Sequence, residues 1–130
     1  MSDNFCKVKG YLNDLNYSII KENIEDGFMM IDKEDEGIKN MVIVIDEPIL
    51  IMEQLIFKVK KDDVAMYKAL LQKNQDILHG AFVMSQDGKH IIFRDTLQVE
   101  NLDLNELSGS LNSLSLLMSE YANKIIEFSA

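Results

Sequence analysis

The sequence predicts an α+β domain in which an antiparallel sheet packs against helices. Near both ends of the chain, apolar residues recur every three or four positions, which indicates amphipathic helices. Between these regions, short runs rich in valine and isoleucine are bounded by turn residues, as is typical of strands. The length of 130 residues suits one core, so we expect residues 1–130 to form a single domain.

The N-terminal region predicts a helix followed by strands. From Ser2 to Asn16 the apolar residues fall on one helical face. The turn pair Asp26-Gly27 precedes an apolar run, Phe28–Ile31, which we interpret as a strand. The segment Tyr17–Glu25 has a weaker strand pattern, so the sequence leaves open whether it joins the sheet.

The middle of the chain predicts two further strands. Met41–Ile45 is an uninterrupted apolar run, as expected for a strand that is buried on both faces. Pro48 ends this run, because proline cannot donate a ladder hydrogen bond. In Ile49–Val59 the odd-numbered apolar residues share one face, and the polar residues Gln54 and Lys58 lie on the other. We therefore expect the odd-numbered positions to form the main apolar face.

A second helix and a hairpin come next. Asp62 and Asp63 are candidate N-caps for a helix that reaches about Asn74. The clearest hairpin joins Ala81–Gln86 to Lys89–Val99 through a turn of the Asp-Gly type, which tolerates positive φ angles. One face of the hairpin is apolar and the other is more polar. We therefore expect one covered face of the sheet and one more polar face.

The last segment has the most regular pattern in the chain. Asp103 and Glu106 form a capping box, and Leu102 pairs with Leu107 as a hydrophobic staple. From Leu104 to Phe128 the apolar spacing alternates between three and four, which predicts one helix of about seven turns. One glycine and several serines lower its helix propensity, so we expect it to depend on packing against the sheet.

No pattern in the sequence meets the requirements of a catalytic, metal or cofactor site. The segment Asp32–Gly37 begins like a calcium loop, but Ile43 stands where a closing glutamate is needed. His79 and His90 have no histidine or cysteine at ligand spacing. We therefore expect an acidic surface loop, no catalytic residues, no metal and no cofactor.

Charge and composition exclude several classes of partner. The net charge of −9 repels phosphate backbones and anionic lipids, so we expect no nucleic-acid partner and no membrane insertion. The longest apolar runs, such as Ile49–Met52, are too short to cross a bilayer. The N-terminus lacks the pattern of a secretory signal. The lone cysteine, Cys6, is expected to be a small buried hydrophobe. We expect a cytoplasmic protein.

Apolar residues outside the main faces predict a surface for another protein chain. Leu50 and Ile56 lie on the second face of their strand, and Leu116 and Ile126 fall off the main stripe of the last helix. Core filling is the simpler interpretation of the eight methionines, although such flexible side chains also suit irregular partners. The candidate partner or dimer surface is therefore Leu50, Met52, Ile56, Leu116 and Ile126.

Local features of the C-terminal half occur in a familiar order: Asn74 at a helix end, Gly80-Ala81-Phe82, an Asp-Gly turn, and Leu102-Asp103 before the final helix. This order resembles the YbjN-like proteins, which are similar to the Tir-type chaperones of type III secretion. The resemblance implies a secretion-chaperone-like α-β-β-β-α-β-β-α domain, commonly a homodimer. It also implies a protein that binds an extended segment of a client and catalyses nothing.

Three functional hypotheses follow. The leading one is a non-enzymatic, chaperone-like or adaptor homodimer that holds an extended segment of a partner protein or secreted client. The alternative is a regulatory module that senses a small ligand in a pocket beneath the last helix. A hydrolase that uses His79 or His90 is the third, and no sequence motif supports it.

Overall fold

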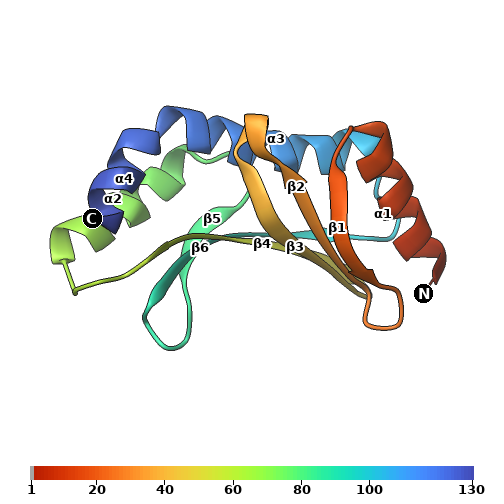
Figure 1. The fold of residues 1–130 in the computed structure, drawn as a ribbon, viewed down its shortest axis with the longest axis horizontal. Coiled ribbons are helices and arrows are strands. Elements are labelled where there is room, and N and C mark those ends of the chain that lie inside the picture. Colours follow the sequence, from red (N-terminus) through yellow and green to blue (C-terminus); the bar gives the residue numbers. More distant parts are fainter. Residues whose placement is uncertain (1) are drawn as a thin grey trace.

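Helices and an antiparallel sheet form two layers in the computed structural model, which describes residues 2–130 (Figure 1). The fold class is therefore α+β, as predicted. The short 3-10 turns are η1 (Glu34–Glu36) and η2 (Asn74–Asp76). The helices and strands, in chain order, are α1 (Ser2–Asp14), β1 (Ser18–Asn23), β2 (Phe28–Lys33), β3 (Ile38–Asp46), β4 (Ile49–Lys58), α2 (Val64–Lys73), β5 (Ala81–Met84), β6 (His90–Gln98), α3 (Leu104–Glu120) and α4 (Ala122–Ser129).

Within residues 2–130 the sheet has six strands in the order β1-β2-β3-β4-β6-β5, and every neighbouring pair is antiparallel. The region Tyr17–Glu25, which the sequence left open, contains β1. The implied α-β-β-β-α-β-β-α order is therefore one strand short. As an edge strand, β1 is exposed at all but one of its positions, so it lacks the alternation that identifies a half-buried strand.

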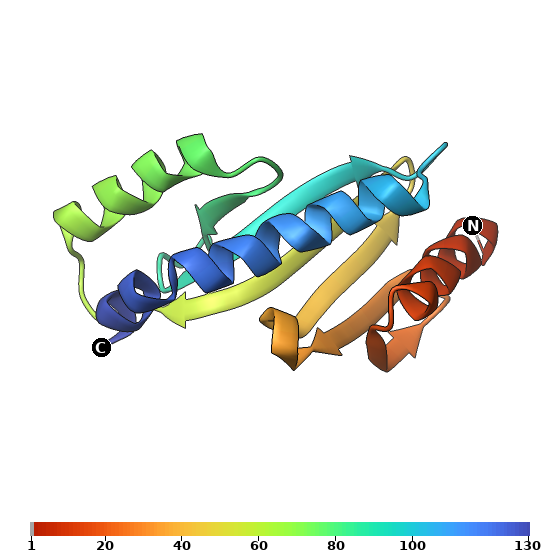
Figure 2. The ribbon, with the colours of Figure 1, turned by 90° about the horizontal axis from the view of Figure 1, so that it is seen from above.

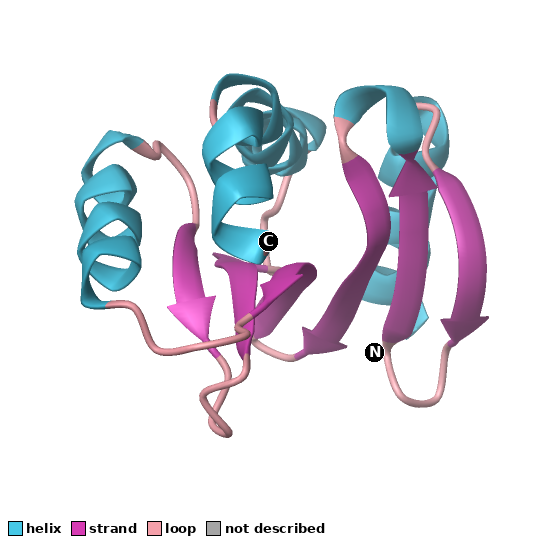
Figure 3. Cartoon of the chain, turned by 60° about the vertical axis from the view of Figure 1, so that its left-hand side comes forward, coloured by secondary structure: helices cyan, strands magenta, loops and turns pink. Residues whose placement is uncertain are grey.

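All the helices of the described chain lie on the same side of the sheet (Figures 2 and 3). Helix α3 runs along the length of the sheet, with α1 near one end and α2 near the other. The core lies between the two layers. Its largest fully buried side chains come from α1, the central strands and α3, and they are Leu12, Met29, Ile31, Ile38, Met41, Ile43, Leu50, Met52, Phe93, Leu107, Leu111 and Leu114.

Helices α2 and α3 begin with side-chain caps, as predicted. Asp63 accepts a hydrogen bond from the Met66 amide at the start of α2, and Asp103 accepts one from the Glu106 amide at the start of α3. Such caps satisfy amides that have no partner within the helix. Leu102, from the predicted hydrophobic staple, is buried beside this helix start.

The last helix is divided at Tyr121, so the prediction of one continuous helix is wrong there. Tyr121 has φ −108° and ψ 9°, outside the helical region. Its ring packs against Phe82, with 5.9 Å between centroids, and against Phe128, with 6.3 Å. The bend brings α4 onto the sheet, where Ile125 is buried.

Cys6 is exposed, which corrects the expectation of a buried residue. Phe5, Val8 and Leu12 already occupy the face of α1 that contacts the core. Cys6 falls beside that stripe and is left on the solvent side.

Gly27 gives a test of the turn between β1 and β2. It has φ +66°, and a Cβ atom there would clash with the backbone carbonyl of Ile45. We expect Gly27→Ala to lower the free energy of unfolding by more than about 1 kcal/mol in urea titrations. Gly10, inside α1, has nothing within 4 Å of such a Cβ. The control Gly10→Ala should raise stability by about 0.5–1 kcal/mol, and a neutral Gly27→Ala would contradict this packing.

Candidate functional site

The face of β4 that points toward the helices is not the one that the sequence pattern favoured. Leu50 and Met52 are fully buried, and Ile56 is partly buried against the core. The ladder shifts register between Leu55 and Phe57, so Phe57 points to the core as well. The placement of Leu50 and Met52 on an exposed partner surface is therefore wrong, and Ile56 packs mainly inward.

Gln54 explains why the face was misassigned. Its side chain is buried, its amide nitrogen donates to the carbonyl of Gly37 at 3.0 Å, and its amide oxygen accepts from the Lys39 amide at 3.0 Å. These bonds satisfy a polar group in the core and tie the start of β3 to β4. Both faces of β4 are apolar, so alternation alone does not identify the inner one.

The sheet face away from the helices is largely apolar, and we call it the open face. Residues paired across neighbouring antiparallel strands lie on the same side of the sheet, so the ladder register places side chains from β2, β3, β4, β6 and β5 side by side. These side chains are only half-buried or are exposed. The open face consists of Phe28, Met30, Val42, Val44, Ile51, Leu55, Val83 and Ile92.

A charged pair lies in the middle of the open face. Glu53 of β4 is paired in register with Arg94 of β6, and their side chains form an ion pair. Both side chains remain about two-fifths exposed, so the pair contributes only about 0–1 kcal/mol to stability. Arg94 has further N–H groups that are available to a polar group of a bound chain.

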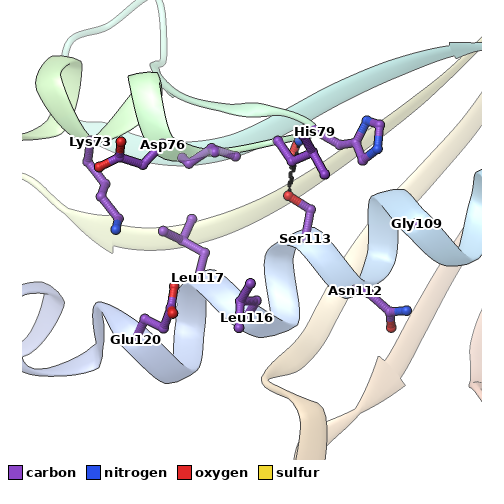
Figure 4. A pocket seen from close by; sticks show the side chains of 11 residues that line it. Lys73, Asp76, His79, Gly109, Asn112, Ser113, Leu116, Leu117 and Glu120 are labelled. Carbon is purple, nitrogen blue, oxygen red and sulfur yellow. Dashed lines mark hydrogen bonds between the residues drawn. The ribbon is translucent and has the colours of Figure 1, made fainter.

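A pocket of about 310 Å³ lies between η2 and α3 on the helix side of the molecule (Figure 4). Ile77 and Leu78 line it from the loop after η2, and Leu116 and Leu117 line it from α3. Leu78 is 85% exposed and Leu116 is 59% exposed. The pocket is therefore an apolar hollow with leucines at its mouth, next to the last helix.

Hydrogen bonds attach the loop at this pocket to α3. The Ser113 hydroxyl donates to the carbonyl oxygen of His79 at 2.8 Å, and the His79 amide donates to that hydroxyl at 3.2 Å (Figure 4). Ser113 thus bonds the backbone of His79, not its imidazole. His90 lies 3.6 Å from Asp87, Nδ1 to Oδ1. Neither histidine is placed here as a base that activates a serine.

A second apolar area lies where α2 meets β5, in a pocket of about 180 Å³. Leu71 of α2 is 70% exposed, and Met84 of β5 lies beside it, also exposed. The Asn74 side chain donates to the Phe82 carbonyl at 3.2 Å and accepts from its amide at 2.7 Å. These bonds cover part of the β5 edge, so side chains dominate this surface.

Three tyrosines have raised pKa values. Burial raises the pKa of Tyr17 to about 12, and burial also raises the pKa of Tyr121. A hydrogen bond to Asp62 raises the pKa of Tyr67. These phenols are protonated at pH 7, and the Tyr67 hydroxyl donates to Asp62 at 2.8 Å.

The acidic segment Asp32–Gly37 joins the end of β2 to the start of β3. It contains η1, followed by Gly37 in the left-handed conformation at φ 76°. Across residues 2–130, no three His, Cys, Asp or Glu side chains are grouped so that they would hold a metal ion. In the same range, none of the helices has the length and apolar character needed to cross a membrane.

Comparison with known proteins identifies the family to which this domain belongs. The family model CesT_Tir_1 matches residues 1–130. The chain belongs to the CesT_Tir_1 family. No curated protein matches the sequence.

Solved structures agree with this CesT_Tir_1 assignment. The E. coli protein YbjN has a TM-score of 0.65 at 13% identity, with 90% of each chain covered. A chain of the HopA1-SchA chaperone-effector complex has a TM-score of 0.60 at 10% identity, covering 98% of this chain and 95% of that one. The Yersinia pestis type III secretion chaperone SycH, in complex with a stable fragment of YscM2, has a TM-score of 0.59 at 18% identity, covering 97% and 99%. The secretion-chaperone-like fold and the YbjN resemblance predicted from the sequence are confirmed.

Adjacent residues of β4 test which face of this CesT_Tir_1 domain is open. Ile51→Thr keeps a β-branched side chain on the open face, so we expect its cost in unfolding free energy to stay below about 1 kcal/mol. Met52→Ala removes a fully buried side chain and should cost about 2–5 kcal/mol. Urea denaturation of the two variants measures both values. A larger cost for Ile51→Thr than for Met52→Ala would reverse the face assignment.

Proposed function

We propose that this protein is a chaperone-like or adaptor protein that binds an extended segment of a partner protein and catalyses no reaction. The observation that carries the proposal is the open face, because apolar side chains from five neighbouring strands lie together without a helix over them. Exposed apolar surface of this kind marks an interaction site.

The shape of the open face favours an extended occupant. Side chains of an extended chain alternate between two sides, so every second residue faces the sheet. The Glu53–Arg94 pair supplies polar contacts among the apolar ones and suits a chain that also presents backbone groups. A globular partner would need a flat apolar surface of its own.

The structural neighbours support this proposal. They include a chain from a chaperone-effector complex and a secretion chaperone in complex with a protein fragment. Family membership over the whole length gives further support. We also propose a cytoplasmic location, which an exposed, unpaired Cys6 thiol suits, since reducing compartments keep thiols free.

Leu55 gives the test of segment binding. It is 58% exposed on the open face, so Leu55→Glu should leave folding unchanged. The probe is a fluorescein-labelled peptide of alternating valine and serine, followed by fluorescence anisotropy. We expect the substitution to weaken binding by about tenfold or more, since it places a charge against apolar side chains. Equal binding by the wild type and Leu55→Glu would contradict the proposed function.

We propose in addition that the protein is a homodimer. Leu71 and Met84 form an exposed apolar area where α2 meets β5, at one end of the sheet. Leu116 on α3 and Ile126 on α4 are also exposed apolar side chains, and Ile126 is 67% exposed. We propose that these two residues contact a partner chain. A two-fold contact through one such patch is the commonest form of homodimer.

The dimer is tested by light scattering coupled to size-exclusion chromatography. The wild type should have twice the 14.9 kDa mass of one chain, and Leu71→Glu should reduce it to the mass of one chain. Leu55→Glu, on the open face, is the matched control and should stay dimeric. A wild type that remains a monomer at high concentration would rule out the dimer.

The pocket beside α3 favours a second candidate function, a module that senses a small apolar ligand. Its volume of about 310 Å³ falls at the lower end of the range of ligand pockets. A thermal-shift screen of small molecules separates the two candidates. A compound that raises the melting temperature in the wild type but not in Leu116→Glu would favour ligand sensing.

A further inference from the structure

Two loops at one end of the sheet enclose a cleft that is rich in lysine. The connection from β4 to α2 contributes Lys60 and Lys61, the turn between β5 and β6 contributes Lys89, and Lys58 lies at the end of β4. The cleft has a volume of about 660 Å³. It gathers four basic side chains in a chain that has 13 lysines and arginines and a net charge of −9.

The four lysines of this cleft outnumber its two carboxylates, so the cleft keeps an excess of positive charge. The two acidic residues of the cleft already accept internal hydrogen bonds: Asp62 from the Tyr67 hydroxyl at 2.8 Å, and Asp87 from the Ser85 hydroxyl at 2.5 Å and the Lys89 amide at 2.9 Å. These bonds to Asp87 lower its pKa, the Ser85 bond most. Within residues 2–130, none of the four cleft lysines forms an ion pair.

The lysine cleft continues the open face. Lys58 of β4 is paired in register with His90 of β6, and Leu55 is paired with Ile92. Phe57 is buried between these positions and points to the helices, so exposed Lys58 points the other way. A chain lying along the open face therefore reaches the lysines directly after Leu55.

We propose that the lysine cleft binds an acidic stretch of the partner protein, adjoining the apolar stretch that lies on the open face. This inference rests on the proposed function and adds the charge of the bound segment to it. A short run of glutamates or aspartates matches the excess of ammonium groups over carboxylates in the cleft. A nucleic-acid strand fits less well, because its phosphates continue beyond the cleft and meet a molecule of net charge −9.

The test compares two fluorescein-labelled peptides by anisotropy at low ionic strength. One is the alternating valine-serine peptide, and the other carries an additional run of glutamates at one end. We expect the acidic peptide to bind the wild type about tenfold more tightly, and the gain to shrink as salt screens the charges. The substitutions K60Q/K61Q/K89Q should abolish the gain.

A second triple variant, K9Q/K68Q/K124Q, is the matched control, because it removes the same charge from lysines of α1, α2 and α4, outside the cleft and the open face. It should retain most of the gain. Circular dichroism verifies the folding of both variants.

The lysine-cleft inference would be overturned if the wild type bound the two peptides with equal affinity. It would also be overturned if both triple variants lost the affinity gain to the same extent. Either result would leave the proposed function standing. Tighter binding of a single-stranded DNA oligonucleotide than of the acidic peptide, lost in K60Q/K61Q/K89Q, would also overturn it. Failure of both peptides to bind would overturn the proposed function together with the inference that rests on it.

Discussion

A sheet that is covered on one side has to be apolar on that side, but in this protein the other side is largely apolar too. In residues 2–130 the helices lie over one face, and the side chains between the layers are closely packed, with Met29, Ile43 and Phe93 among those that are essentially inaccessible to solvent. Burial of these groups is the main source of stability. Apolar residues on the uncovered face gain little from the fold of one chain, and they are explained best by a second chain.

The central strand β4 connects the core to the open face. Its inner residues meet α3 and α4, and Gln54 fixes the turn before β3 through its buried amide. Its outer residues form the middle of the open face and end at Lys58. A chain bound along β4 would contact Ile51 first, then the Glu53–Arg94 pair, then Leu55, and finally the lysine cleft. The arrangement thus combines broad apolar affinity with charges that orient the bound chain.

Features set by local chemistry could be predicted from the sequence, whereas features set by tertiary context could not. The caps at Asp63 and Asp103 and the hairpin turn depend on a few adjacent residues, and the structure has them where the pattern places them. The face of β4 escaped prediction because both of its faces are apolar. Edge strand β1 has no alternation, and the bend at Tyr121 depends on rings distant in sequence.

The candidate surface was predictable only in part. Leu116 and Ile126 fall off the helical stripe, and the structure leaves both exposed, but their contact with a partner stays a prediction. The lysine cleft was missed. Lys58, Lys60 and Lys61 are adjacent in the sequence, but only the pairing of β4 with β6 brings Lys89 to them.

Methyl NMR tests the central claim most directly, because it identifies which side of the sheet a bound chain touches. Isoleucine, leucine and valine methyl groups of the full chain are observed while the alternating valine-serine peptide is added. We expect signal changes at Val44, Ile51 and Ile92 on the open face, and none at the buried Leu111. Changes confined to Leu78 and Leu116 beside α3 would contradict the claim that the open face is the binding surface.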